Sequence, residues 1–564
     1  MPRPRLRTWL ASLAALLSFV LAGYDANPTT LVSTPYLAEL DNPFPSASEQ
    51  DSIRRALYSC DTATFILTAL LLTPCFMQRQ GRRGTLLLGA VYAFVGALIQ
   101  VISPNKAVAV LGRFFATLGK AFALPAALVY IAEVASTADR GVLLSLAQTA
   151  YQLGSFLVFW VHAAPGTATR QPELAARVTP LVQLYFPLLL LLGMLLAPES
   201  PRWLASRGRY EAAMRALATV RDEMDPRALE ELEEIIRAAP APEKSDYFHQ
   251  LSPYVELVVN SASRHRLLLA LGLGLGLTAG GSAQVVSDAG AAYAYAFWPR
   301  QQGTSLDQDP NIDMSELALA RRYIRSSTGP GLAFFVLPAV RRAIELVSAA
   351  AAPALIKRVG RRRLLLLGAG ASAVLLVPLG AVGGIANVLT KRGVLVGYRT
   401  GWATWTIQGV RVDNPRRSLG VLYAIFSTLL RAVHLPTLGA GVLTYTAEMF
   451  GQGVRAHGVS IALAFYALLD AVLNHQAFAR FTASAGLYTF FLFAGVCLVL
   501  CGFVYVLIPE TRGADLEEME DVFEPEEPYA RAPSVMSMAS IESFGSRPRS
   551  SGSKRRQPLA RLGV

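Results

Sequence analysis

The sequence predicts an all-α, polytopic membrane protein with twelve transmembrane helices in two similar halves. Of its 564 residues, 53% are hydrophobic and only 16% are charged, whereas a soluble protein carries roughly a quarter of its residues as charges. The apolar residues gather in runs of about 20, enough for a helix to cross a bilayer. Short charged strings follow four of these runs, and each kind of string occurs once in each half.

Twelve apolar runs predict the membrane spans. They lie near 10–33, 56–76, 84–103, 108–131, 141–163, 179–197, 267–287, 331–355, 364–386, 421–443, 458–479 and 487–508. The first run follows the basic segment 1–9 and resembles a signal peptide in its composition. We interpret it as a span, because it brings the total to an even number.

The basic residues predict the orientation of the chain. The net charge is +12, and most Lys and Arg flank apolar runs, as the positive-inside rule expects of cytoplasmic loops. This pattern argues against nucleic-acid binding. The loops at 77–83 and 356–363 are the most basic, so we expect these loops and both termini to be cytoplasmic. We expect a multi-pass protein of the plasma membrane.

Polar stretches divide the chain into parts. The segment 203–266 contains amphipathic helical patterns and is predicted to be a cytoplasmic helical linker between two halves, 10–202 and 267–512. The remainder, 513–564, is predicted to be a cytoplasmic tail. From about Glu524 it is rich in Ser, Arg and Pro, a composition typical of disorder. Its serines are either phosphorylation sites or part of a plain solvated tail, the interpretation we favour.

The second half contains an insertion. Glu133 follows Gly81 by 52 residues, whereas the corresponding Glu448 follows Gly360 by 88. The basic segment 388–418 fills this difference and is expected on the extracellular side, against the positive-inside rule. It is either an extracellular lid or an intron translated by mistake.

Charged residues stand where several predicted helices leave the bilayer. Ion pairs that form in one state and break in another bias a two-state equilibrium, so we interpret these charges as a gate rather than as plain interfacial anchors. The candidate gating charges are Arg82, Glu133, Arg140, Glu199, Arg202, Arg361, Glu448, Arg455, Glu510 and Arg512.

Taken in order, the motifs resemble the sugar porter family of the major facilitator superfamily, and within it the fungal members, over residues 10–525. The motifs are Gly23-Tyr24-Asp25, Gly112-Arg113, Tyr130–Glu133, Arg140-Gly141, Pro198–Leu204, Gly208-Arg209, Tyr445–Glu448, Arg455 and Pro509–Gly513. The resemblance implies two six-helix bundles, a substrate cavity between them and alternating access. The chain departs from the family at Gln78 and Lys357, where the usual pattern has an Asp at the helix end.

The resemblance also implies a proton-coupling pair. Asp25 matches the carboxylate that the family uses for coupling, and Arg113 matches its cationic partner. Lys120 lies two turns beyond Arg113 on roughly the same helix face. It either adds a second cation beside Asp25, which would keep that carboxylate ionised, or faces elsewhere.

The solute-binding positions match the family only in part. Gln148 and Gln284 match its sugar-binding glutamines, whereas an aromatic position reads Leu443. The candidate solute-binding residues are Gln148, Gln284, Asp288, Tyr293 and Asp470. The added acids favour a polyol, an amine-bearing solute or another polar metabolite. Arg431 and His434 could instead bind an anionic group, or they could pair with Asp470.

These features predict a secondary-active transporter for a sugar or sugar-like polar solute, driven by protons, acting in the lipid bilayer as a monomer. We expect neither an enzyme nor a cofactor nor a metal site, because the six histidines are scattered and the four cysteines fall in apolar runs. The alternation of Leu and Gly at 271–276 suits close helix packing. A proton-independent facilitator, or a non-transporting receptor on the same fold, are the alternatives.

Overall fold

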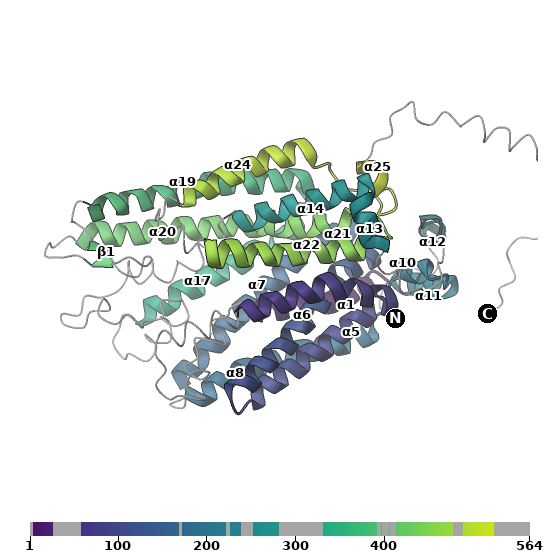
Figure 1. The fold of residues 1–564 in the computed structure, drawn as a ribbon, viewed down its shortest axis with the longest axis horizontal. Helices are drawn as coiled ribbons and strands as arrows, with labels where there is room; N and C mark the ends of the chain where they lie inside the picture. Colours follow the sequence, from purple (N-terminus) through teal and green to yellow (C-terminus); the bar gives the residue numbers. More distant parts are fainter. Residues whose placement is uncertain are drawn as a thin grey trace, which may run out of the picture. The chain divides into compact units, whose positions relative to one another are not determined.

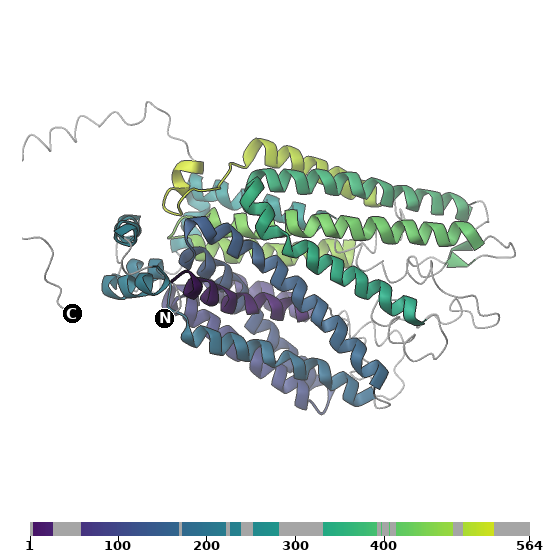
Figure 2. The ribbon, with the colours of Figure 1, turned by 180° about the vertical axis from the view of Figure 1, so that it is seen from behind.

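The computed structural model is helical almost throughout the part of the chain that it describes. It describes residues 4–25, 58–168, 172–221, 226–238, 252–280, 331–391, 396–397, 405–406, 413–477 and 489–523. The chain up to Phe523 forms one compact unit. In this unit the helices of the first half lie beside those of the second half along a common long direction (Figures 1 and 2).

The first half contains the six spans that the sequence predicts. Its elements are α1 (Pro4–Asp25), a helix at 58–67, the π-helix η1 (Thr68–Leu72), α5 (Thr73–Ile102), α6 (Lys106–Val134), α7 (Thr137–Ala168), α8 (Pro172–Gln183) and α9 (Tyr185–Leu196). Gly81, with φ 86°, interrupts α5, and the predicted spans 56–76 and 84–103 lie on either side of this kink. The side chain of Asn105 caps the next helix by accepting a hydrogen bond from the N–H of Val108.

Four short helices follow between the halves. They are α10 (Pro201–Ser206), α11 (Tyr210–Val220), α12 (Pro226–Ala238) and α13 (Ser252–Val259). The amphipathic patterns of the predicted linker, at 210–217 and 225–238, form helices, since α11 and α12 coincide with them. The hydroxyl of Thr8 in α1 donates to the carbonyl of Val220, at 2.7 Å, and so ties α11 to the start of the chain. Helices α10 and α11 lie at the same end of the bundle as the N-terminus (Figure 1).

The second half repeats the pattern of helices and π-helical segments. Its elements are α14 (Ser261–Ala279), α17 (Gly331–Ala350), α18 (Ala352–Val359), α19 (Arg361–Lys391), α20 (Asp413–His434), η5 (Leu435–Gly439), α21 (Ala440–Glu448), α22 (Arg455–Leu469), η6 (Asp470–Ala477), α24 (Thr489–Leu507) and α25 (Met519–Phe523). The Leu–Gly alternation in α14 does serve packing. A Cβ added at Gly274 would lie 2.0 Å from the ring of Tyr466 in α22.

The predicted insertion partly lengthens the two helices beside it. Helix α19 continues to Lys391 and α20 begins at Asp413, so each reaches beyond its predicted span. Between them, β1 (Val396–Gly397) and β2 (Trp405–Thr406) pair antiparallel. The other residues of 392–412 lie outside the described ones.

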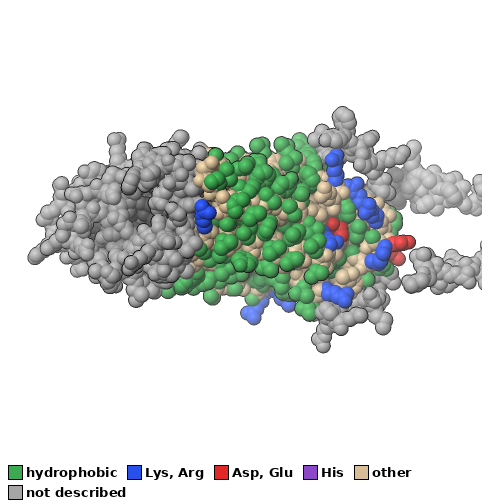
Figure 3. Space-filling view, turned by 90° about the horizontal axis from the view of Figure 1, so that it is seen from below, with side chains coloured by type: hydrophobic (Ala, Val, Ile, Leu, Met, Phe, Trp, Pro, Cys, Tyr) green, Lys and Arg blue, Asp and Glu red, His purple; other side chains and the backbone are tan. Residues whose placement is uncertain are grey.

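The surface and length of the helices fit a membrane. Among the described residues, nine helices are long and apolar enough to cross a bilayer, and one of them, Tyr58–Ile102, holds two predicted spans. Helices α14 and α17 account for the remaining two. Figure 3 shows a broad apolar band on one face, with Lys and Arg gathered toward one end. Large apolar side chains such as Leu71, Leu367 and Val499 are exposed on this bundle.

The two halves meet through few helices. Helix α7 of the first half packs against α17, α18 and α21, and α22 of the second half packs against α5 and α6. The core runs through this junction and includes Tyr130 and Val442, which are fully buried. Polar groups on α7 and α22 therefore lie where the halves touch.

Candidate functional site

A charged cluster in the first half, the N-terminal clamp, consists of Gly81, Arg82, Glu133, Glu199 and Ser200. Arg82 and Glu133 form a buried ion pair, with Nη2–Oε1 and Nε–Oε2 distances of 2.9 Å. The carboxylate of Glu199 accepts hydrogen bonds from the backbone N–H of Arg82, at 3.0 Å, and of Arg83, at 3.1 Å. Glu199 therefore caps the helix segment that begins after Gly81, where a negative charge is favoured.

The second half repeats this geometry in the C-terminal clamp, which consists of Gly360, Arg361, Glu448, Glu510 and Thr511. Arg361 pairs with Glu448, with Nη2–Oε1 at 2.7 Å and Nε–Oε2 at 3.1 Å. The carboxylate of Glu510 accepts from the N–H of Arg361, at 2.8 Å. In both halves, therefore, corresponding carboxylate oxygens bind the N–H groups at the start of corresponding helices, the segment after Gly81 and α19.

Both clamps require glycine at the kink. Gly81 and Gly360 have φ values of 86° and 91°, which L side chains rarely adopt. A Cβ at these positions would lie 2.3 Å from the carboxylate of Glu199 and 2.6 Å from that of Glu510. The glycine therefore supplies both the backbone conformation and the room for the capping carboxylate.

Hydroxyl groups complete the repeat. The phenol of Tyr130 donates to the carbonyl of Pro198, at 2.8 Å, and that of Tyr445 donates to Pro509, at 3.0 Å. The hydroxyl of Ser200 donates to Glu133, as the hydroxyl of Thr511 does to Glu448, at 3.1 Å.

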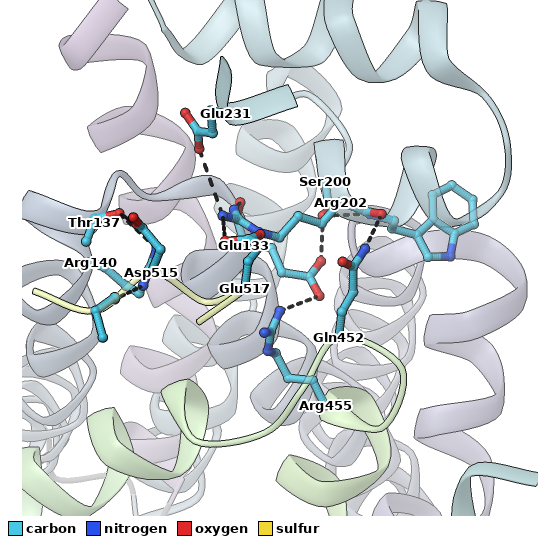
Figure 4. A network of polar contacts seen from close by, with 12 residues as sticks. Glu133, Thr137, Arg140, Ser200, Arg202, Glu231, Gln452, Arg455, Asp515 and Glu517 are labelled. Atoms are coloured by element: carbon cyan, nitrogen blue, oxygen red, sulfur yellow. Dashed lines mark hydrogen bonds and ion pairs between the residues drawn. The ribbon is translucent and has the colours of Figure 1, made fainter. Parts of the chain in front are cut away.

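The two clamps lie at the same end of the bundle, since Arg361 of the C-terminal clamp contacts Gly141 of the first half. We call this end the clamp end. Several polar contacts join the two halves there (Figure 4). Arg455 of α22 lies 3.6 Å from Glu133 of α6. The side chain of Gln452 donates to the carbonyl of Arg202 in α10, at 2.9 Å. Arg140 of α7 donates to the carbonyl of Ala514, at 3.3 Å. The clamp end is therefore closed by contacts between the halves.

The carboxylate of Glu517, which follows the last span, also joins the two halves at the clamp end. Glu517 accepts from Arg202 at Nε, at 2.7 Å, and at Nη2, at 3.2 Å. Glu231 of α12 lies 3.9 Å from the same guanidinium. Burial by itself raises the pKa of Glu517, but Arg202 outweighs burial and lowers this pKa to about 2. The sequence interpretation missed Glu517, although the acidic run after Pro509–Gly513 was a visible signal.

The predicted gating charges all lie at the clamp end, and they are not equivalent. The side chain of Arg512 is exposed and donates to the carbonyl of Arg358, at 3.2 Å, whereas Arg82 and Arg361 are buried and pair with carboxylates. Burial raises the pKa of Glu199, an effect that hydrogen bonds from backbone N–H groups oppose.

At Gln78, where the family has an acid, the backbone carbonyl accepts from the indole of Trp203, at 3.0 Å.

A second charged group, the coupling cluster, joins Asp25, Asp61, Arg113 and Lys120. Asp25, the last residue of α1, forms ion pairs with both Arg113 and Lys120 of α6. Lys120 therefore lies beside Asp25, as the first of the two sequence interpretations expected. Arg113 also pairs with Asp61 of the helix at 58–67, and Asp61 accepts from the hydroxyl of Thr117, at 2.9 Å. The sequence interpretation missed Asp61, although an acid within an apolar run was a signal for it.

The candidate solute-binding residues are placed only in part. The carboxamide of Gln148 in α7 faces η5 of the other half, because a Cβ at Gly439 would lie 3.0 Å from its Oε1. The carboxylate of Asp470 accepts from the hydroxyl of Tyr58, at 3.3 Å. The three candidates Gln284, Asp288 and Tyr293 lie outside the described residues. Arg431, for which the sequence left two partners open, forms an ion pair with Glu345, at 3.2 Å.

Comparisons with known proteins agree with this architecture. The sequence model of the family described as "Sugar (and other) transporter" matches residues 10–285 and 323–523. Probable polyol transporter 3 of Arabidopsis thaliana is 28% identical over 463 residues, which cover 78% of each chain. The probable quinate permease of Aspergillus fumigatus is 26% identical over 530 residues, covering 91% of this chain and 87% of the relative.

Solved structures of similar fold include the major facilitator superfamily proton:xylose symporter XylE bound to 6-bromo-6-deoxy-D-glucose. It superimposes with a TM-score of 0.69 at 19% identity, covering 92% of this chain and 99% of that one. The inward open conformation of XylE from E. coli superimposes with a TM-score of 0.54 at 19% identity, covering 91% and 99%. At this identity the likeness shows the fold, which in this chain carries the two clamps and the coupling cluster.

Proposed function

Because this chain belongs to the family of sugar (and other) transporters, we propose that it carries a sugar or sugar-like polar solute across a membrane by alternating access. The repeated clamp is the observation that carries this proposal. Two halves with matching charged pairs meet at one end and are joined there by polar contacts. Such contacts can break together when the halves move apart, and they therefore bias an equilibrium between two states.

The solute is a polyhydroxylated molecule. The relatives named above include a polyol transporter and a quinate permease, and a further relative is the high-affinity glucose transporter of Kluyveromyces lactis, 24% identical over 535 residues. These names share a compact, hydroxyl-rich solute. Gln148 and the carboxylate of Asp470 would supply the hydrogen-bonding groups that such a solute needs.

The clamp end is the cytoplasmic end, and the protein works in the plasma membrane. The basic loops at this end support that orientation, because cytoplasmic loops are rich in Lys and Arg. With the clamps closed on the cytoplasmic side, the solute enters from outside. Opening of the contacts between Arg455 and Glu133 and between Arg202 and Glu517 then releases it inside.

Protons drive the transport through Asp25. A carboxylate held by cations can exchange them for a proton when its surroundings change. In the coupling cluster, protonation of Asp25 would release Lys120 and one side of Arg113. Asp61 would keep the other side of Arg113 compensated, so that no buried guanidinium is left alone.

Uptake measurements test both parts of the proposal. The chain is expressed in a yeast strain that lacks its own hexose carriers, and initial uptake of labelled sugars and polyols is measured with and without an imposed proton gradient. We expect uptake of at least one polyol against its gradient. Asp25→Asn should abolish accumulation, whereas Glu211→Gln, which alters an exposed carboxylate of α11, should not.

The outcomes separate the alternatives. If Asp25→Asn still concentrates the solute with an unchanged dependence on pH, the carrier is not coupled to protons at this residue. Equilibration without accumulation by the wild-type chain indicates a facilitator. A chain that reaches the cell surface and carries no sugar, polyol or related acid would contradict transport and favour a receptor.

A further inference from the structure

The coupling cluster contains one cation and one acid beyond the pair Asp25 and Arg113. Each member of that pair also binds a second partner. Lys120 of α6 pairs with Asp25, and Asp61 of the helix at 58–67 pairs with Arg113. Among the described residues, the four side chains therefore form a row in which positive and negative charges alternate, in the order Lys120, Asp25, Arg113 and Asp61.

One face of α6 supplies both cations. Arg113, Thr117 and Lys120 follow one another at spacings of four and three residues, so they lie along one side of the helix. The hydroxyl of Thr117 on this side donates to the carboxylate of Asp61, at 2.9 Å. Asp61 is thus held beside Arg113 by a hydrogen bond as well as by the ion pair.

The row is buried most deeply at its centre. The side chain of Asp25 is 2% exposed, whereas that of Asp61 is 16% exposed. Buried charges are screened less by salt than charges at the surface, and they act on one another more strongly. Lys120 and Asp61, at the two ends of the row, therefore both influence the charge state of Asp25.

Lys120 and Asp61 act on Asp25 in opposite directions. A cation beside a carboxylate favours its ionised form, and a second negative charge nearby opposes that form. Without Asp61, protonation of Asp25 would leave Arg113 and Lys120 buried with no carboxylate of the row to compensate them, which is strongly unfavourable. With Asp61 present, one acid still compensates the two cations, and Asp25 can take up a proton.

Phenol groups adjoin the row as well. Asp25 acts electrostatically on Tyr24 of α1 and on Tyr151 of α7. Tyr58 donates to the carboxylate of Asp470 in η6, at 3.3 Å, so this further acid belongs to the second half. A phenol is neutral below about pH 10, and these tyrosines therefore add no charge to the row near neutral pH.

We propose that Asp61 is a positioning residue for proton coupling, which offsets the charge of Lys120 and thereby sets the pH range in which Asp25 exchanges its proton. This inference rests on the proposed function, because it assigns a role within proton-coupled transport. While the clamp end is closed, Asp25 takes a proton from water on the outer side, and Arg113 stays with Asp61. When Asp25 gives up the proton on the inner side, Arg113 and Lys120 pair with it again.

The protonation of Asp25 can be measured without transport. Infrared difference spectra of the purified full-length protein, recorded without solute while the pH is changed, report the C=O stretching band of a protonated carboxyl group. The part of this band that is missing in Asp25→Asn belongs to Asp25. We expect Asp61→Asn to move the midpoint of this part by about one pH unit or more toward lower pH, because a buried negative charge a few ångströms away is lost.

Matched variants separate the charge of Asp61 from its place in the packing. Asp61→Glu keeps the charge and should leave the midpoint within about half a pH unit of the wild type. Asp61→Asn combined with Lys120→Met lacks one acid and one cation, and its midpoint should return toward that of the wild type. A change at Lys120 would not reverse a loss of packing around Asp61. Glu211→Gln, on an exposed carboxylate of α11, is the control and should leave the midpoint unchanged.

Two results would overturn the inference. One is an equal midpoint in the wild type and in Asp61→Asn, and the other is a wild-type protein in which the Asp25 band does not titrate. If Asp61→Asn by itself does not fold, Lys120→Met is compared with the double variant, in which the charges of the row stay balanced. The same shift of about one pH unit is expected between these two proteins.

Uptake of labelled sugars and polyols into proteoliposomes, recorded on the same preparations, reports the transport function separately. A midpoint that depends on Asp61, in a protein that carries none of these solutes, would support the role of Asp61 and count against transport. Uptake by a protein whose midpoint does not depend on Asp61 would leave the transport function standing and overturn the inference.

Discussion

Removing the charge of Glu517 should open the clamp end of the bundle. Glu517 follows the last span of the second half, and Arg202 in α10 follows the last span of the first half, so their bond ties the ends of the two halves together. Glu517→Gln keeps the shape of the side chain and removes its charge. A carboxyl whose pKa falls from its usual 4.5 to about 2 is stabilised in its ionised form by about 3 kcal/mol.

The expected effect is smaller than this value. Glu231 lies 3.9 Å from the same guanidinium and remains as a partner for Arg202. We therefore expect Glu517→Gln to shift the equilibrium toward the state with an open clamp end by roughly tenfold to a hundredfold, which corresponds to about 1.4 to 2.7 kcal/mol.

Distances between spin labels measure this shift. Labels at Arg209 and Lys357, which are both exposed at the clamp end, report the separation of the halves in a variant without the four native cysteines. Glu517→Gln should add a longer distance to the distribution. Glu518→Gln is the matched control, because Glu518 is adjacent and exposed. Identical distributions for both variants and the wild type would refute the assigned role of Glu517.

The pKa of Glu517 also predicts a pH dependence. Because this pKa is lowered in the closed state, the stabilisation is fully present above about 4.5 and is lost as the pH falls toward 2. The distance distribution should therefore stay constant between about pH 6 and pH 8. A shift toward open distances within that interval would show that another group controls the clamp end.

Three further predictions follow from the clamps and the coupling cluster. Gly360 has a φ of 91°, and a Cβ there would lie 2.6 Å from the carboxylate of Glu510, so Gly360→Ala should lower the thermal unfolding midpoint of the purified protein by a few degrees. The control Gly453→Ala, whose Cβ would meet no atom within 4 Å, should leave the midpoint unchanged. Equal midpoints for the two variants would contradict the capping argument. Glu133→Gln should reduce uptake about tenfold or more per molecule at the cell surface, because Arg82 and Arg455 lose their shared carboxylate; wild-type uptake would reject a gating role. Lys120→Gly should make initial uptake more dependent on external pH, because one of two cations beside Asp25 is removed; an unchanged pH profile would show that Lys120 does not control coupling.

Much of the architecture could be predicted from the sequence alone. Hydropathy indicates the spans because a bilayer requires about 20 consecutive apolar residues, whatever the helices pack against. The basic loops predicted at 77–83 and 356–363 contain the same string, Gly81-Arg82-Arg83 and Gly360-Arg361-Arg362, and the two glycines with positive φ lie there. Their glutamates, Glu199 and Glu510, could be recognised because each follows a span directly and recurs in the other half.

The partners of the buried charges depended on the tertiary structure. Asp61 and Arg113 are 52 positions apart, and Arg202 and Glu517 are 315 apart. No periodicity in the sequence relates residues at such separations, because helix packing alone brings them together. The sequence allowed Arg431 to pair with Asp470, and only the packing of α20 against α17 directs it to Glu345.

The sequence by itself determined which residues enter the membrane and which kinds of charge stand at the helix ends, since both follow from the transfer of side chains and backbone into lipid. The tertiary structure decided which of these charges compensate one another. Coulombic attraction in a medium of low dielectric constant depends on distances of a few ångströms, and such distances between helices are set only when the two halves pack.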